Sequence, residues 1–281
     1  MSKLDDLIAE VSVTKRLVSV AADRAGLTAL VGGPGPDGQP RLGSYSYASL
    51  ATTIQAAAAG LTWRGLKPRD VVGVLAPDVV GFALATHAIR AAGGVPSPVD
   101  LTLGAVETAG QLAESGARMV ITAPPLADTA VAAVDRSWVR QVFSFVDTPG
   151  ATRFTDLLGL DIIRPSRGRP DDVALLPFFR GIDGRLRPAP VSHGELVQLI
   201  DQADQDAGIT SRDVVLALPP FGDGLGYAAL IDGALLRGAT VVAVHGNELA
   251  MAAALHHGTV VVVPKDAGIE VPGSVRAIPV G

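Results

Sequence analysis

Short valine-rich runs, separated by alanine-rich segments, constrain the fold of this chain more than any other feature. Most runs are apolar at every position, which is typical of strands covered on both faces. The segments between them have lengths and compositions that favour helices. The predicted strands are "VVGVL" (71–75), "MVIT" (119–122), "VFSFV" (142–146), "VALLP" (173–177), "VVLAL" (214–218), "TVVAV" (240–244) and "TVVVV" (259–263), and the predicted helices cover roughly 47–63, 78–92, 105–116, 126–136, 193–207, 225–237 and 247–257.

This alternation predicts an α/β protein with largely parallel sheets covered by helices. The stretch 147–172 is polar and rich in Gly, Pro and Arg, which predicts a connector. We therefore expect two α/β halves, residues 1–150 and 151–281. Ser192 is followed three residues later by Glu195, a capping-box pattern that predicts a helix start just after the serine.

Composition excludes several classes of function. Of the 281 residues 48% are hydrophobic, so a full core is available and disorder is not expected. The net charge of -5 gives no electrostatic footprint for nucleic acid, and we expect no nucleic-acid partner. There are no cysteines, which excludes disulfides, thiolate catalysis and cysteine-based zinc sites. This suits a reducing cytosol, and we predict a cytoplasmic location.

The mean hydropathy of +0.36 raises the question of a membrane segment. The most apolar stretch, 71–94, is interrupted by Pro77, Asp78, His87 and Arg90. A spanning helix needs about 20 nearly uninterrupted apolar residues, and the N-terminus lacks the apolar run of a secretory signal. We expect no membrane span.

The residues offer no local signature of catalysis or of metal binding. No G-x-S-x-G elbow occurs. The adjacent His256 and His257 point in different directions, and a metal site would need further ligands. We therefore predict no catalytic residue and no metal site in this chain.

Four segments in the first half, taken in order, carry a resemblance. They are "YSYASL", "GLKPRDVVGVLAPD", "AAGGVPSPVD" and "LAESGARMVIT", all within 45–122. Together they resemble the opening region of the adenylate-forming superfamily, which includes acyl-CoA synthetases, aryl-CoA ligases and peptide-synthetase adenylation domains. The resemblance covers essentially 40–245. The resemblance implies the fold of the N-terminal domain of these enzymes. It implies ATP, magnesium and CoA as reactants only if the family activity is retained. If that activity is lost, we expect no cofactor.

The stretch "LLPFFRGIDGRLRPAPVSH" (175–193) resembles the family's phosphate loop. Gly181 and Gly184 fall on the two glycines of that loop, and Arg187 falls on its basic residue. Ser192-His193 falls on the family's Ser-His pair. The resemblance implies that this loop is the nucleotide-binding site.

Side chains in the loop conflict with that role. A phosphate loop needs small residues and inward-pointing donors, but here two phenylalanines and an isoleucine offer none, and Asp183 repels an anion. Two interpretations stay open: Arg180 and Arg187 attract an anion, or, together with Arg185, they form a solvated, charged loop. In either case the nucleotide site is degenerate.

Further departures concern the acyl pocket and the end of the chain. Gly222 stands where the family has the His or aromatic residue of its acyl pocket. The chain ends at "GSVRAIPVG", before the segments that in the family carry the adenine-stacking aromatic, the magnesium-serving Thr-Glu pair, the ribose-binding aspartate and the lid domain with its lysine. We expect a truncated N-terminal domain without that lid.

Two functions stay open. The first is a diverged, non-catalytic homologue, a pseudoenzyme that binds an acyl, nucleotide or protein ligand. The second is an AMP-dependent acyl-CoA synthetase, an acid–thiol ligase, whose remaining half is missing or separately encoded. Ending inside the second sheet exposes apolar surface, which favours a homodimer or a protein that supplies the missing half.

Overall fold

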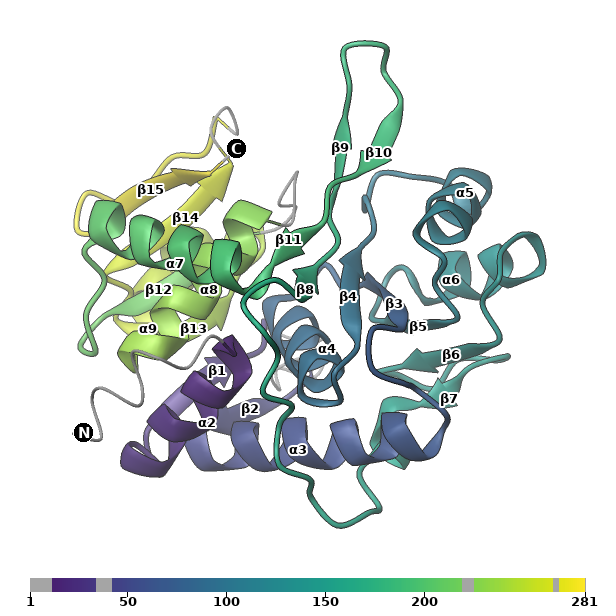
Figure 1. Ribbon diagram of the computed structural model, residues 1–281. Helices are drawn as coiled ribbons and strands as arrows, with labels where there is room; N and C mark the ends of the chain where they lie inside the picture. Colours follow the sequence, from purple (N-terminus) through teal and green to yellow (C-terminus); the bar gives the residue numbers. More distant parts are fainter. Residues whose placement is uncertain (1–11, 34–41, 219–224, 265–267, 281) are drawn as a thin grey trace.

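The computed structural model describes residues 12–33, 42–218, 225–264 and 268–280, and it contains two mainly parallel sheets with helices on their faces (Figure 1). This confirms the predicted fold class. Every predicted helix is present, with ends that differ by no more than a few residues. The helices are α2 (Val13–Asp23), which the sequence analysis missed, α3 (Tyr47–Trp63), α4 (Val79–Ala91), α5 (Ala105–Ser115), α6 (Ala127–Ala133), α7 (His193–Ala207), α8 (Leu225–Arg237) and α9 (Leu249–His256).

The first sheet has the strand order β4-β3-β5-β6-β7, and all neighbouring strands are parallel. In Figure 1 α5 and α6 lie on its outer side, and α3 and α4 lie on the side that faces the second sheet. Its strands are β3 (Val71–Leu75), β4 (Val95–Pro98), β5 (Met119–Thr122), β6 (Gln141–Ser144) and β7 (Thr152–Arg153).

The second sheet has the order β15-β14-β12-β13-β1-β2, and it is parallel except for the antiparallel pair β1–β2. Two of its strands come from early in the chain, because Leu30 of β1 pairs with Val241 of β13. The predicted boundary at residue 150 therefore does not separate the two sheets, and the division into two halves stays a prediction. The strands are β1 (Thr28–Val31), β2 (Ser44–Ser46), β12 (Val214–Ala217), β13 (Thr240–Ala243), β14 (Val260–Pro264) and β15 (Arg276–Val280).

The valine runs are unbroken because their strands are covered on both faces. Val260 and Val262 of β14 belong to the main core, which lies between the two sheets, whereas Val261 faces the opposite way into a smaller cluster with Leu249 of α9. The first sheet has the same arrangement, with a separate cluster under α5 and α6. Successive side chains of a strand alternate between faces, so two apolar faces require a continuous apolar run.

A buried charged cluster joins the helices that lie between the sheets. Every residue of α4 is buried, including His87 and Arg90. His87 Nε2 lies 3.1 Å from Asp232 Oδ1, and Arg90 Nη1 donates to Asp232 Oδ2 at 2.9 Å; Asp232 belongs to α8. His87 Nδ1 also lies 2.9 Å from Thr14 Oγ1 of α2, and Arg90 Nε donates to the carbonyl of Ala174. Burial acts to raise the pKa of Asp232, but its interactions with His87 and Arg90 hold that pKa below its usual value.

Candidate functional site

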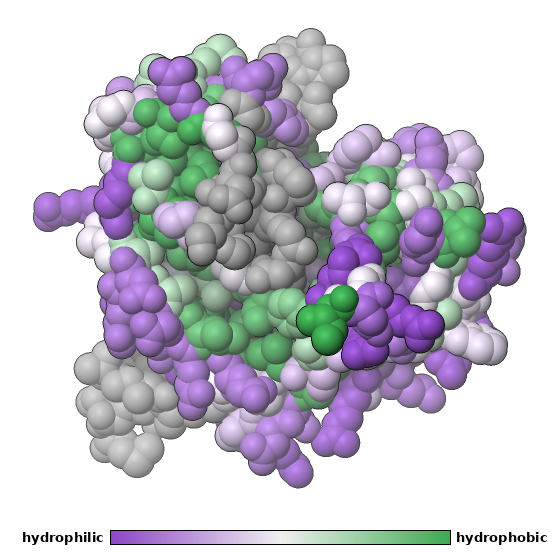
Figure 2. Space-filling model, turned by 90° about the horizontal axis from the view of Figure 1, so that it is seen from above, coloured by the Kyte–Doolittle hydropathy of each residue, from purple (hydrophilic) through white to green (hydrophobic). Residues whose placement is uncertain are grey.

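The predicted phosphate loop is the turn of a hairpin that projects from the rest of the molecule (Figure 1). Strands β9 (Phe178–Arg180) and β10 (Leu186–Pro188) pair with each other in a sheet of their own, with Arg187 opposite Phe179. The second strand ends at Pro188, which pairs with Phe178, and the N–H of Ala189 then donates to the carbonyl of Pro177 at 2.9 Å. Figure 2 looks down on this hairpin, where hydrophilic side chains predominate, and Ile182 at the turn is fully exposed.

Both glycines of the loop serve the turn. Gly184 has a φ of 75°, in the left-handed region that glycine adopts without strain. The N–H of Gly181 donates to the carbonyl of Arg185 at 2.8 Å, and the N–H of Gly184 donates to the carbonyl of Gly181 at 2.9 Å. A Cβ on Gly181 would lie 2.9 Å from Asp183 Oδ1. The backbone donors of both glycines are thus engaged inside the turn.

The carboxylate of Asp183 binds Arg187, the cation that the resemblance assigns to phosphate, and one backbone N–H of the turn. Its Oδ1 accepts from the N–H of Arg185 at 3.2 Å, and its Oδ2 accepts from Arg187 Nη2 at 2.6 Å. The loop therefore contains its own anion, bound by one backbone N–H and one guanidinium.

Arg180, the other arginine expected to attract an anion, is also engaged. Its Nη1 donates to the carbonyl of Gly184 at 2.8 Å, and its Nη2 lies 3.4 Å from Asp100 Oδ2. The side chains of Arg180 and Arg187 are both more than half exposed. These contacts favour the charged-loop interpretation, and nucleotide binding at Gly181, Gly184 and Arg187 stays a prediction.

The Ser-His pair that follows the hairpin starts a helix. Strand β11 (Val191–Ser192) pairs with β8 (Val173–Leu175), and α7 begins at the next residue. Ser192 Oγ accepts from the N–H of Glu195 at 3.2 Å, and Glu195 Oε2 accepts from the N–H of Ser192 at 2.8 Å. This confirms the capping box. The backbone N–H and the hydroxyl of Ser192 hold the pKa of Glu195 below its usual value.

Three further sequence predictions concern the acyl pocket, metal binding and a membrane span. Gly222, the predicted acyl-pocket position, lies outside the described residues. Within the described ranges no group of three or more His, Asp or Glu side chains is arranged to hold a metal ion. No helix in those ranges is long and apolar enough to cross a bilayer.

A groove of about 590 Å³ runs between α7, α8 and the edge strand β15. Leu199 of α7, Leu230 of α8 and Ile278 of β15 contribute apolar lining. Arg276 donates from its Nη1 to the carbonyl of Ala207, which ties the edge strand to the end of α7. The groove lies beside the edge strand, where we expected apolar surface to be exposed.

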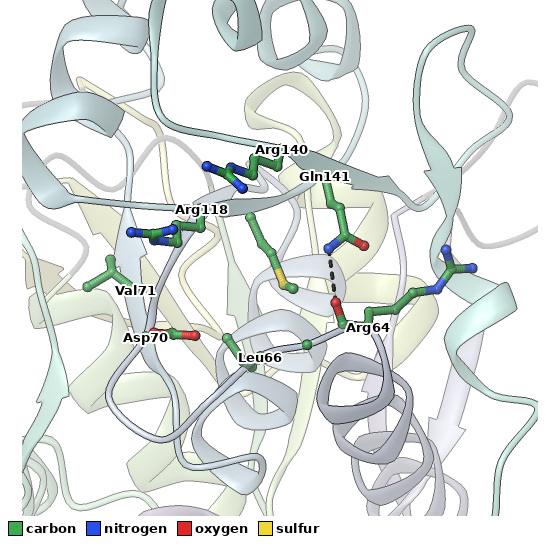
Figure 3. Close-up of a pocket in the computed structure, with 9 residues that line it drawn as sticks. Arg64, Leu66, Asp70, Val71, Arg118, Arg140 and Gln141 are labelled. Carbon is green, nitrogen blue, oxygen red and sulfur yellow. Dashed lines mark hydrogen bonds between the residues drawn. The ribbon is translucent and has the colours of Figure 1, made fainter.

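A second, smaller pocket lies at the amino-terminal edge of the first sheet, and none of its residues was predicted to form a site (Figure 3). Arg118 and Arg140 line it, one directly before β5 and the other directly before β6. A cation one or two residues before a predicted strand, repeated for two neighbouring strands, is the signal that could have identified them.

Two mainly parallel, helix-covered sheets with a projecting loop hairpin define the class of the protein: an α/β domain like the N-terminal domain of adenylate-forming enzymes. The benzoate CoA ligase from Burkholderia xenovorans LB400 superposes with a TM-score of 0.76 at 20% identity, over 90% of this chain and 50% of that one. A long-chain-fatty-acid-CoA ligase from Archaeoglobus fulgidus gives a TM-score of 0.79 at 18% identity, over 91% and 52%. At these identities the likeness establishes the fold.

The family is established by sequence. The AMP-binding enzyme family matches residues 18–264, and the chain belongs to that family. It is 28% identical over 220 residues to 4-coumarate–CoA ligase 4 from Arabidopsis thaliana, and the aligned region covers 73% of this chain and 38% of the relative. It is 27% identical over 199 residues to a feruloyl-CoA synthase from an Amycolatopsis species, covering 71% and 38%. The chain thus spans well under half the length of these relatives, and the predicted resemblance is confirmed.

Proposed function

We propose that this chain is a non-catalytic member of the AMP-binding enzyme family, which binds a ligand or a partner and does not activate an acid with ATP. The observation that carries the proposal is the occupation of the loop by Asp183. A triphosphate entering the turn would have to displace this carboxylate from Arg187 and from the N–H of Arg185, and would be repelled by it.

The chemistry of the family explains why this matters. Acyl-adenylate formation brings a carboxylate to the α-phosphate of ATP, and two anions react only where preorganised donors and positive charge offset their repulsion. In this loop the positive charge of Arg187 is already offset by Asp183 at 2.6 Å. ATP, magnesium and CoA enter the function only if the family activity is retained. A cytoplasmic location is part of the proposal and stays a prediction.

Isothermal titration with ATP and magnesium tests the nucleotide part. We expect weak binding or none, and a dissociation constant in the micromolar range, about -8 kcal/mol, would contradict the proposal. Pyrophosphate release is then measured with a panel of fatty and aryl acids, with an active CoA ligase assayed in parallel as the positive control. We expect no release by this chain, and turnover by the isolated chain would show that it is an enzyme.

The groove beside β15 supports a second candidate, the acid–thiol ligase whose remaining half is a separate polypeptide. Edge strands and apolar grooves favour docking of another chain. The test adds a polypeptide that carries the remaining length of a relative, and turnover only in the mixture would establish this candidate. Ile278→Asp in the groove should then abolish the turnover, whereas Leu255→Asp, at an exposed position of α9, should not.

A homodimer through the same groove is a distinguishable outcome. Sedimentation velocity at several concentrations would show a shift from monomer to dimer. Ile278→Asp would prevent that shift, and the Leu255→Asp control would retain it.

A further inference from the structure

The pocket at the amino-terminal edge of the first sheet is built by the residues that precede three neighbouring strands. Asp70, Arg118 and Arg140 stand directly before β3, β5 and β6. The N–H of Arg140 donates to the carbonyl of Arg118 at 2.9 Å, and the N–H of Arg118 donates to the carbonyl of Val71 at 3.3 Å. Because the sheet is parallel, these three starts lie at the same edge, and the two arginines are cross-strand neighbours.

The two arginines face the same side of the pocket. In Figure 3 the side chains of Arg118 and Arg140 extend in the same direction above Asp70, whereas the side chain of Arg64 extends to the opposite side. Neither Arg118 nor Arg140 makes an ion pair or a side-chain hydrogen bond within the described part of the chain. By contrast, Arg153 binds Asp147 at 2.7 Å. Like charges directly opposite each other in neighbouring strands are unfavourable, and an anion placed between them would remove that repulsion.

Asp70 is the carboxylate in the lining, and it is engaged elsewhere. Its Oδ2 accepts from the N–H of Lys67 at 2.9 Å. It offsets part of the positive charge without forming an ion pair with Arg118 or Arg140. The guanidinium groups of Arg118 and Arg140 outnumber the single carboxylate of Asp70, so the pocket carries a net positive charge.

The size of the pocket restricts the ligand. Its volume is about 140 Å³. Sites for organic ligands usually measure roughly 300–1,000 Å³. The Nε2 of Gln141 donates to the carbonyl of Arg64 at 3.0 Å and fixes one wall, and Leu66 and Met119 add apolar lining. This small volume favours one tetrahedral oxyanion group over a whole nucleotide as the ligand.

The two tryptophans of the chain are neighbours of this pocket in the sequence. Trp63 and Trp138 are 71% and 69% exposed, and they stand one and two residues before the lining residues Arg64 and Arg140. The guanidinium carbon of Arg64 lies 5.3 Å from the centroid of a Trp63 ring. Exposed tryptophans are typical of surfaces that contact another molecule or a lipid interface.

We propose that this pocket binds a phosphate group through the guanidinium groups of Arg118 and Arg140. Planar guanidinium groups match the geometry of phosphate oxygens and form charge-assisted hydrogen bonds with them. The group has two sources with the same chemistry, free inorganic phosphate and the headgroup of an anionic phospholipid. The site is separate from the loop hairpin and does not depend on the function proposed above.

Intrinsic tryptophan fluorescence is the readout, since Trp63 and Trp138 stand next to lining residues in the sequence. The full chain is titrated at low salt with inorganic phosphate, with phosphatidylglycerol–phosphatidylcholine vesicles and with phosphatidylcholine vesicles alone. We expect a saturable change with phosphate or with the anionic vesicles, weakening as salt is added. Saturation by phosphate identifies the free anion as the ligand. Saturation by the anionic vesicles alone identifies the headgroup.

Three variants assign the binding to the pocket. Arg118→Gln combined with Arg140→Gln should lower the affinity at least about tenfold, because charge-assisted hydrogen bonds are lost. Asp70→Asn should raise the affinity. Arg212→Gln, which removes an exposed arginine before β12, should leave it unchanged. Circular dichroism and thermal melting verify that each variant is folded, and the single Arg140→Gln variant replaces the double one if that fails to fold.

Two results would overturn the proposal. The first is the absence of saturable binding tighter than about 1 mM with both phosphate and anionic vesicles. The second is binding by the Arg118→Gln, Arg140→Gln protein that equals binding by the parent.

Discussion

Replacing Asp183 by serine should restore anion binding to the loop hairpin. The carboxylate now accepts hydrogen bonds from Arg187 Nη2 at 2.6 Å and from the N–H of Arg185 at 3.2 Å. Serine is smaller and uncharged, and its hydroxyl is a donor of the kind that a phosphate loop requires. We expect the Asp183→Ser protein to bind triphosphate measurably more tightly than the parent does.

The expected gain in affinity depends on how exposed the side chains of Asp183 and Arg187 are. The side chains of Asp183 and Arg187 are 41% and 63% exposed, so the ion pair that an incoming phosphate must break is worth about 0.2–1 kcal/mol. Repulsion between the carboxylate and a phosphate about 4 Å away adds roughly 1 kcal/mol in water, and more at a partly desolvated site. Removing both terms should gain about 1–3 kcal/mol, which corresponds to roughly a 5- to 150-fold increase in affinity.

Isothermal titration with tripolyphosphate and with ATP measures this gain. Asp156→Ser is the matched control, because it removes an exposed carboxylate elsewhere and changes the net charge equally. The double variant Asp183→Ser, Arg187→Ala should lose the gain. An equal increase in affinity in the Asp156→Ser protein would show that only net charge matters. No increase in the Asp183→Ser protein would refute the view that this carboxylate occupies an anion position.

Three further predictions concern stability. Asp232→Asn should destabilise the protein by about 3–5 kcal/mol, since it leaves the buried guanidinium of Arg90 without a counter-charge; urea denaturation at pH 7 measures this. The lowered pKa of Asp232 means that its stabilisation is complete above the unfolded carboxyl pKa of about 3.9 and is lost as the pH falls. The Asn variant should therefore lose less stability than the parent between about pH 5 and pH 2, and an unchanged acid profile would contradict this. Gly60→Ala should lower the free energy of unfolding by about 1–3 kcal/mol, because its Cβ would overlap with the backbone atoms of Leu157. Gly110→Ala, at an exposed position of α5 with open space around it, should stabilise by about 0.5–1 kcal/mol, and equal effects of the two substitutions would refute the packing explanation.

The sequence predicted the sheets well because their signal is local. A strand such as β14 is covered on both faces, so each of its positions requires an apolar residue. The resulting apolar run is visible in the sequence even when the neighbouring strands are unknown. The pairing of β1 with β13 was not predicted. It joins Leu30 to Val241, which are distant in the sequence, and no local pattern specifies which sheet a short N-terminal strand will join.

The candidate sites were predicted only in part, for a related reason. The glycines and the arginine of the loop were predicted through a resemblance, and the conflict between Asp183 and phosphate stays a prediction. That its carboxylate binds Arg187 and the N–H of Arg185 depends on the conformation of the turn. Likewise, His87 and Arg90 are visible in the sequence as polar interruptions, but their partner Asp232 is more than 140 residues away. Contacts between distant residues need the fold before they can be assigned.

The loop hairpin and the arginine pocket lie at opposite edges of the first sheet, which makes the two proposals independently testable. Arg180 of the hairpin lies 3.4 Å from Asp100, which follows β4 by two residues, so the hairpin lies at the carboxyl-terminal edge, where open α/β sheets usually bind ligands. Arg118 and Arg140 precede β5 and β6 at the other edge. A strand of four or five residues separates these edges by about 13–17 Å, more than the Debye length of about 8 Å at physiological ionic strength. A charge removed at one edge is therefore largely screened at the other. Phosphate binding that responds to Arg118 and Arg140 but not to Asp183 belongs to the amino-terminal edge, and the reverse response belongs to the hairpin.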